Sequence, residues 1–185
     1  MPVIISMLRG VNLLGHNRIK MEALRALYES LDLQGPQTCV QSGNVVFKTK
    51  GRSLPRLAKR IEDGIERSLG FRPSVILRTP AELREVIAKN PFAKREGIEP
   101  SKLLVTFLAG DPGADARHKV RQIKADPEEI HIDGREMFIY YPIGIGQSQL
   151  SMAPVERALK TPGTARNWNT VTKLLAIAEE MEASR

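Results

Sequence analysis

A group of polar side chains that could bind an anion follows the first apolar segment of the sequence. The segment Val3–Leu8 is rich in β-branched residues and predicts a buried strand, and Arg9, Asn12, His16 and Asn17 come after it. An arginine at the end of a buried strand needs a carboxylate, a carbonyl oxygen or the anion of a ligand as its partner. We therefore expect Arg9 to bind a negative charge here, with Asn12 orienting the bound molecule.

A tight turn supplies a second set of polar groups. The sequence predicts a hairpin over 37–41 and 45–49 whose turn contains Gly43. In a β-α-β-β-α-β sheet this turn lies at the edge where the first strand ends, so we expect three further polar residues beside Arg9: Gln41, Ser42 and Asn44. Polar loops at strand ends are typical of binding sites. The alternative is that these Asn and Gly residues are ordinary turn residues.

Two later loops are further candidates for anion binding. In the segment 141–148, Gly-x-Gly-x-Ser stands between a predicted strand and a predicted helix, where backbone N–H groups can surround an anion. Its polar or flexible members are Gly144, Gly146 and Ser148. The last candidate precedes the final predicted helix and contains Arg166, Asn167 and Asn169, of which either asparagine could instead cap the helix.

The basic side chains are concentrated in the first half of the chain. The net charge of +7 comes entirely from residues 1–80. The densest segment has no acidic residue and contains Lys48, Lys50, Arg52, Arg56, Lys59 and Arg60. Such a segment favours contact with phosphates of nucleic acid. The alternative is a solvated surface that the nearby acids Glu62, Asp63 and Glu66 partly neutralise.

The sequence lacks the residues that several common kinds of metal site and active site require. A single cysteine, Cys39, excludes a disulfide framework and a zinc site made of thiolates, and we expect it in the core. The three histidines have no metal-ligand spacing, and the sequence contains no Walker A, His-Glu-x-x-His or Gly-x-Ser-x-Gly motif. No metal is predicted, no cofactor is identified, and the sequence does not decide whether the protein is an enzyme.

The elements that must position these residues occur in two similar series. Strand, helix, hairpin, helix and strand succeed one another over residues 3–78, and Thr79-Pro80-Ala81-Glu82 predicts the start of a further helix. From residue 103 the series returns, with a hairpin across Asp133-Gly134, but helices stand where its closing strand is expected. The fold class predicted is α+β, with two ferredoxin-like (βαββαβ-type) halves packed together, the second irregular.

The predicted boundaries follow from composition. We assign residues 1–90 to an N-terminal ferredoxin-like half plus a helix, 91–101 to a polar linker with Pro and Gly, and 102–185 to a C-terminal ferredoxin-like half with terminal helices. No apolar run approaches the length of a membrane span, and the first residues do not match a secretory signal. We therefore expect a cytoplasmic protein without a membrane partner.

The assembled motifs resemble those of a bacterial family, domain of unknown function 1697. The resemblance rests on Leu8-Arg9-Gly10-Val11-Asn12, Gln41-Ser42-Gly43-Asn44-Val45-Val46-Phe47, Gly144-Ile145-Gly146-Gln147-Ser148 and Thr164-Ala165-Arg166-Asn167-Trp168-Asn169-Thr170. It implies an α+β chain of two ferredoxin-like halves and no established activity. Gln147 departs from the pattern, where a basic residue is expected, so a strongly cationic second loop is not implied.

Three functions therefore compete at this point. The first is binding of a small anionic, phosphate-bearing ligand by the polar loops. The second is binding of nucleic acid by the basic first half. The third is a protein-interaction module without a ligand.

Overall fold

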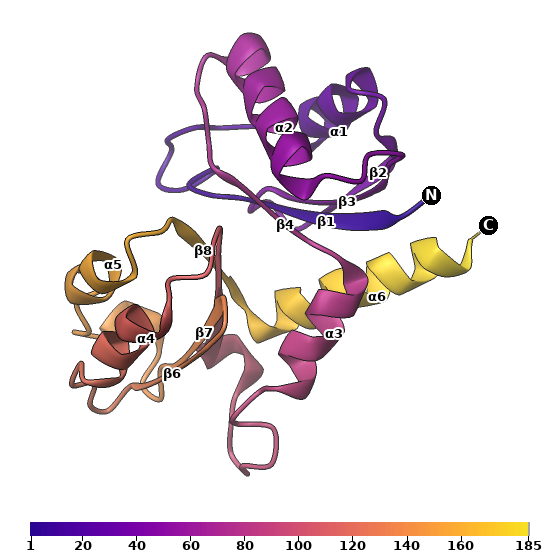
Figure 1. Ribbon diagram of the computed structural model, residues 1–185. Coiled ribbons are helices and arrows are strands. Elements are labelled where there is room, and N and C mark those ends of the chain that lie inside the picture. Colours follow the sequence, from indigo (N-terminus) through magenta and orange to yellow (C-terminus); the bar gives the residue numbers. More distant parts are fainter. Residues whose placement is uncertain (185) are drawn as a thin grey trace. The chain divides into compact units, whose positions relative to one another are not determined.

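The computed structural model describes residues 1–184, and these divide into two compact units. Unit 1 contains residues 1–85 together with the chain from residue 172 onward, and unit 2 contains residues 86–171. Each unit has its own four-stranded antiparallel sheet, and the whole is an α+β protein with six α-helices among the described residues (Figure 1). No helix of residues 1–184 is long and apolar enough to cross a membrane.

Unit 1 has the element order predicted for the first half. Its elements are β1 (Val3–Leu8), α1 (Met21–Ser30), β2 (Gln34–Cys39), β3 (Asn44–Lys48), α2 (Leu54–Leu69) and β4 (Val75–Arg78). The strands lie in the order β2-β3-β1-β4, all antiparallel. β2 ends earlier than predicted because Val40 takes a left-handed φ of 51°, which turns the chain before Gln41.

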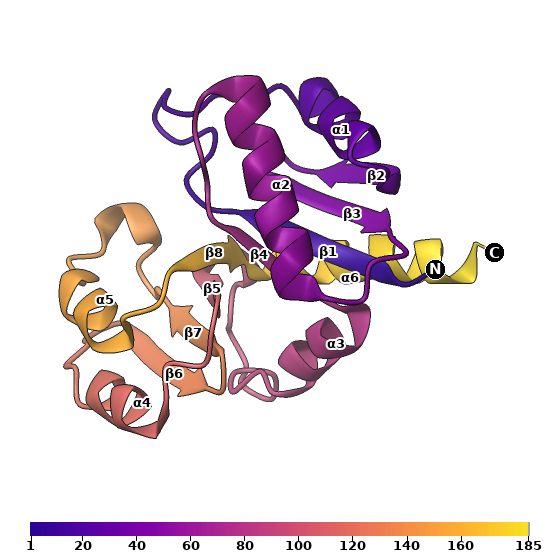
Figure 2. The same ribbon diagram turned by 45° about the horizontal axis from the view of Figure 1, so that its top comes forward.

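The core of unit 1 forms where α1 and α2 cover one face of the sheet (Figure 2). Alternate residues of β1 and β3, such as Ile4 and Phe47, face the helices, and Tyr28 of α1 packs edge-on against Phe47 with ring centroids 5.3 Å apart. Tyr28 is fully buried, and its hydroxyl lies 2.8 Å from the Ser6 hydroxyl of β1. This pair satisfies two buried polar groups inside an apolar core.

Unit 1 also contains the start of the helix that follows β4 and the end of a helix that is distant in sequence. α3 (Pro80–Ala88) begins at the predicted capping box, in which the Thr79 backbone N–H donates to Glu82 at 2.7 Å. The end of α6 (Trp168–Ala183) joins this start of α3 through Arg84, which bonds Glu179 and Glu182. The contacts divide the chain after residues 85 and 171, whereas the sequence places the boundaries at residues 90 and 102.

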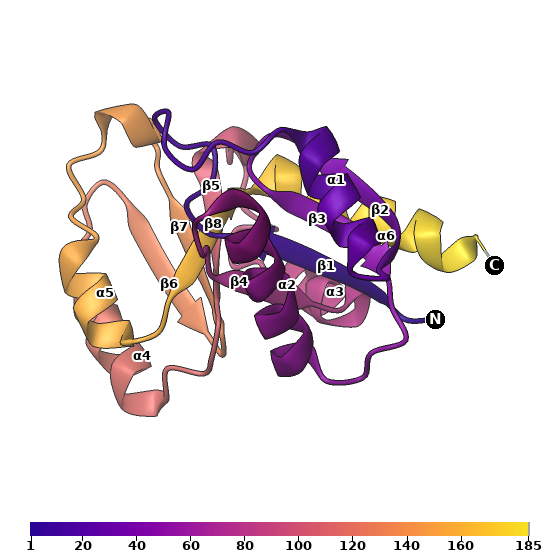
Figure 3. The same cartoon turned by 90° about the horizontal axis from the view of Figure 1, so that it is seen from above.

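Unit 2 repeats the same element order. It contains β5 (Leu103–Leu108), α4 (Ala114–Arg121), β6 (Glu129–Asp133), β7 (Glu136–Tyr140), α5 (Ala153–Leu159) and β8 (Gly163–Asn167), with two short 3₁₀ helices at Pro100–Lys102 and Ile145–Gln147. The strand order is β6-β7-β5-β8, and α4 and α5 lie on one side of the sheet (Figure 3). The predicted hairpin across Asp133-Gly134 is confirmed.

The predicted irregularity of the second half is wrong, because β8 closes the sheet. β8 pairs with β5 from Leu108↔Gly163 to Leu104↔Asn167. Gly163 is required for this close approach, since a Cβ there would come 2.9 Å from side-chain atoms of Thr106 and Leu108. The strand was not recognised because Gly-Thr-Ala-Arg-Asn has no alternating apolar residues.

Candidate functional site

The loop after β1 and the turn before β3 are neighbours, as the sequence predicts. The Leu8 backbone N–H donates to the Gly43 carbonyl at 3.0 Å, and the Asn12 amide Nδ2 donates to the Gln41 carbonyl at 2.7 Å. A Cβ on Gly43 would come 2.4 Å from a methyl carbon of Val11, and Gly43 has a φ of 76°. Only glycine therefore allows the two segments to lie this close.

The amides of this region hold the backbone of the loops. Asn12 accepts a hydrogen bond from the Ile19 N–H at 2.8 Å and donates back to the Ile19 carbonyl at 3.1 Å. Asn44 is fully buried and donates to the Cys39 carbonyl and to the Ser42 hydroxyl. These side chains hold the loops in shape. Their contacts therefore do not support the role that we expected of them, which is to orient a ligand.

Arg9 has a different environment. Its backbone N–H donates to the Ser74 carbonyl, which fixes the end of β1, while its side chain is exposed. Within residues 1–184 its guanidinium takes part in no hydrogen bond and no ion pair. Gln41, in the turn before β3, is exposed as well. Among the polar residues predicted in these two loops, Arg9 and Gln41 are thus the two that remain open to a bound molecule within residues 1–184.

The basic segment before and along α2 is partly used by the fold. Lys48 donates to the Ser184 carbonyl and Arg60 to the Leu31 carbonyl. The others are exposed and form no ion pair within residues 1–184: Lys50, Arg52, Arg56 and Lys59. The nearby acids are occupied by Arg72, whose hydrogen bond lowers the pKa of Asp63. Apart from Arg60, which lies 4.0 Å from Asp32, the basic side chains of this segment have no ion-pair partner within residues 1–184.

The Gly-x-Gly-x-Ser loop of unit 2 bonds mainly to itself. The N–H groups of Gly144, Gln147 and Ser148 each donate to the carbonyl oxygen three residues earlier in the chain. The Ser148 hydroxyl accepts from the Leu150 N–H at 3.1 Å. Gly146 is exposed. Three of the N–H groups that we expected to surround an anion are thus already bonded.

Arg166 and the asparagines after it also have structural partners. Arg166 is 7% exposed and donates to the Thr164 hydroxyl at 2.6 Å and to the Ala165 carbonyl. Burial lowers the pKa of its guanidinium to about 10. Asn167 caps α6 by accepting from the Thr170 N–H at 2.9 Å, one of the alternatives expected, and Asn169 is exposed.

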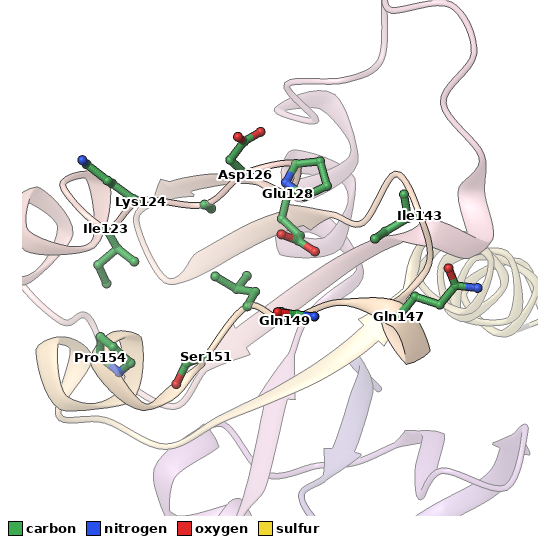
Figure 4. Close-up of a pocket in the computed structure, with 12 residues that line it drawn as sticks. Ile123, Lys124, Asp126, Glu128, Ile143, Gln147, Gln149, Ser151 and Pro154 are labelled. Atoms are coloured by element: carbon green, nitrogen blue, oxygen red, sulfur yellow. The ribbon is translucent and has the colours of Figure 1, made fainter.

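A cavity of about 390 Å³ lies in unit 2, between the segments 123–128 and 143–154 (Figure 4). Its distinctive group is Glu128, which is 3% exposed and precedes β6. Within residues 1–184 no group donates a hydrogen bond to its Oε1 atom. The pKa of the nearby Tyr141 hydroxyl is raised, mainly by burial and to a smaller extent by the charge of Glu128. The carboxylate points toward the segment that carries Gln149 (Figure 4).

A smaller cavity of about 250 Å³ lies beside the β6–β7 hairpin. Its charged groups already have partners, because Lys89 pairs with Asp133 at 3.2 Å and Arg121 donates to the Ile132 carbonyl. No cluster of three His, Cys, Asp or Glu side chains among residues 1–184 could hold a metal ion. Cys39 is buried, and burial raises the pKa of its thiol.

Comparison with known proteins gives a family. The sequence matches the family described as "Protein of unknown function (DUF1697)" over residues 1–138, well over half of the chain. The chain belongs to this family. The resemblance inferred from the motifs is therefore confirmed. A search of the curated proteins finds no match to this DUF1697 protein.

One solved structure is similar to this DUF1697 chain along almost its whole length. It is the conserved bacterial protein SP0830 from Streptococcus pneumoniae, with 20% identity and a TM-score of 0.70. The match covers 96% of this chain and 98% of the other. At this identity the likeness shows the fold alone.

Glu128 is the residue of this DUF1697 protein that sequence analysis missed. It stands in Asp126-Pro127-Glu128-Glu129, a polar segment with a proline that predicts an exposed turn. The predicted Gly-x-Gly-x-Ser loop does lie near this cavity, since its residue Gln147 lines it. Only the placement of the two segments against each other shows that one of these acids is buried.

Proposed function

We propose that this protein binds a small anionic ligand, such as a phosphate ester, at the loop that follows β1. The observation that carries the proposal is the exposed guanidinium of Arg9, unpaired within residues 1–184, beside the turn that contains Gly43. The loop adds Arg18 and Lys20, and no acidic residue precedes Glu22. An exposed cation in a wholly basic loop favours anions.

The predicted site residues contribute unequally to this proposal. Arg9 would bind the charge and Gln41 would contact the ligand, while Asn12, Ser42 and Asn44 would keep the loops in place through the hydrogen bonds described above. The proposal does not use Arg166 or Ser148, because both donate or accept within unit 2.

Thermal unfolding with inorganic phosphate, ATP and glucose 6-phosphate tests the proposal. A ligand present at 100 times its Kd stabilises the protein by about 2.7 kcal/mol. At this chain length that corresponds to a rise in Tm of roughly 5–10 °C. Arg9→Ala should abolish the rise, while Arg52→Ala, a matched exposed arginine in no ion pair, should leave it unchanged. The proposal is refuted if none of the three anions raises Tm, or if both variants lower the effect equally.

Nucleic-acid binding by the basic segment is the second candidate. It is favoured by Lys50, Arg52, Arg56 and Lys59, which are exposed and form no ion pair within residues 1–184. Binding of a single-stranded oligonucleotide should weaken with salt, with a log–log slope of about −0.7 per phosphate contact. Replacing Arg52 and Arg56 with Ala should reduce that slope by about 1.4. Affinity that does not change with salt excludes nucleic-acid binding. If the phosphate compounds also fail to raise Tm, a protein-interaction module without a ligand is the remaining function.

We further infer that each unit is a ferredoxin-like fold and that the protein acts in the cytoplasm. The β-α-β-β-α-β order and the antiparallel strand orders β2-β3-β1-β4 and β6-β7-β5-β8 support the fold. A single free, buried cysteine agrees with a reducing compartment.

A further inference from the structure

Glu128 is an unusual residue to find buried without a partner. Carboxylates are almost never fully buried unless they are paired, because loss of water around the charge is costly. Glu128 is 3% exposed, and its Oε1 atom accepts no hydrogen bond from residues 1–184. The fold therefore maintains an acceptor that has no donor of its own.

The space next to this acceptor is large enough for a small molecule. The cavity measures about 390 Å³, within the range of roughly 300–1,000 Å³ that ligand sites span. Figure 4 shows the Glu128 carboxylate directed between the two segments that form the walls, whereas the side chain of Asp126 points away from the opposite segment. Glu128 thus provides the polar group inside the cavity.

The remaining walls combine apolar surface with a few amides. Ile123, Ile143 and Leu150 contribute aliphatic side chains, and Gln147 and Gln149 contribute exposed amides. Small-molecule sites have this character, since apolar walls contact the body of the ligand and a few polar groups fix its orientation. The ligand that fits has an apolar body and a group that donates hydrogen bonds.

The sign of the charge on the ligand follows from Glu128. An anion would meet the Glu128 carboxylate inside the cavity, and like charges at close range repel. The one cation that lines the cavity, Lys124, is exposed, forms no ion pair within residues 1–184 and is directed away from Glu128 in Figure 4. A cation from outside the protein is therefore the complementary partner.

We propose that the cavity of unit 2 binds the ammonium or guanidinium group of a small, partly apolar molecule, with the Glu128 carboxylate accepting its N–H groups. Charge-assisted hydrogen bonds of this kind are stronger than neutral ones, and they supply the donor that Glu128 lacks. The site is separate from the one proposed at Arg9, because the two lie in different units and share no residue. Either proposal can fail without the other.

Benzylammonium, titrated against its uncharged counterpart benzyl alcohol, tests this proposal on the whole protein. Both carry the same ring, so their difference isolates the cationic group. In ¹H–¹⁵N NMR spectra we expect benzylammonium to shift the backbone amide signals of the non-proline residues in 123–128 and 147–154 saturably. Its Kd should be at least about tenfold lower than that of benzyl alcohol, since a buried charge-assisted bond is worth that much.

Two variants separate Glu128 from the general negative charge of the region. Glu128→Gln keeps the shape of the side chain and should remove the preference for benzylammonium over benzyl alcohol. Asp126→Asn removes an exposed acid at the same cavity and should leave the preference intact. The proposal is overturned by an absent or non-saturable shift in the native protein, by equal affinities for the two compounds, or by a preference that survives Glu128→Gln. The comparison on the native protein decides the matter even if a variant does not fold.

Discussion

Replacing Glu128 with Gln should make the ligand-free protein more stable. The native side chain places a carboxyl group at a position that is 3% exposed, and its Oε1 has no donor within residues 1–184. The amide that replaces it has nearly the same shape, so packing is retained while the cost of burying a charge is removed. An unsatisfied buried polar group costs about 1–3 kcal/mol, and a charged one costs more. Because the amide also lacks a partner, the gain in stability is only the difference between the costs of burying an unsatisfied carboxylate and an unsatisfied amide.

We expect that difference to be about 1–2 kcal/mol, because the amide retains part of the cost of an unsatisfied buried group. At this chain length the gain corresponds to a rise in Tm of roughly 2–8 °C. Urea unfolding at pH 7, followed by circular dichroism and checked by calorimetry, measures it. If the two units unfold in separate transitions, the transition of unit 2 should be the one that moves.

Asp126→Asn is the matched control, since Asp126 is exposed and borders the same cavity. Its effect should stay within about 0.5 kcal/mol, as is usual for surface substitutions. The reasoning is refuted if Glu128→Gln destabilises the protein while Asp126→Asn does not. That outcome would mean that the carboxylate has a donor in solution, for example Lys124, and that its charge stabilises the fold.

Three further predictions concern unit 1. Gly43→Ala should destabilise the protein by at least about 2 kcal/mol in urea unfolding, because φ is 76° and the new Cβ would lie 2.4 Å from a methyl carbon of Val11. Tyr28→Phe should cost about 1–3 kcal/mol by leaving the Ser6 hydroxyl without its partner at 2.8 Å, and adding Ser6→Ala should recover part of that loss in a double-mutant cycle. The Cys39 thiol, whose pKa is raised by burial, should react with a thiol reagent at pH 8 at least about tenfold more slowly in the folded than in the urea-unfolded protein.

Much of the architecture is predictable because it depends on local signals. Val3–Leu8 and Val75–Arg78 are runs of apolar residues that make strands buried on both faces, and Asp133-Gly134 specifies a hairpin turn. β8 is different, since its buried side chains, Thr164 and Arg166, are polar. Arg166 donates to the Thr164 hydroxyl within β8, and the strand pairs with β5 without an apolar alternation, so hydrophobic periodicity does not show it.

The candidate sites divide in the same way. The neighbourhood of Arg9 and Gly43 follows from topology, so it can be predicted before any coordinates exist. The hydrogen bonds that occupy Asn12 and Asn44 cannot, because they depend on where single backbone carbonyls point. Glu128 is hidden for a further reason. It lines a cavity whose other wall begins fifteen residues later in the chain, at Ile143.

The return of the last helix to the first unit affects how the protein can be made. β1 to β4 leave the ribosome early, yet the part of α6 that packs in unit 1 is synthesised after all of unit 2. Domains ordinarily fold in order as they emerge. Here unit 2 can fold first, while unit 1 lacks its part of α6 until all of unit 2 has been synthesised.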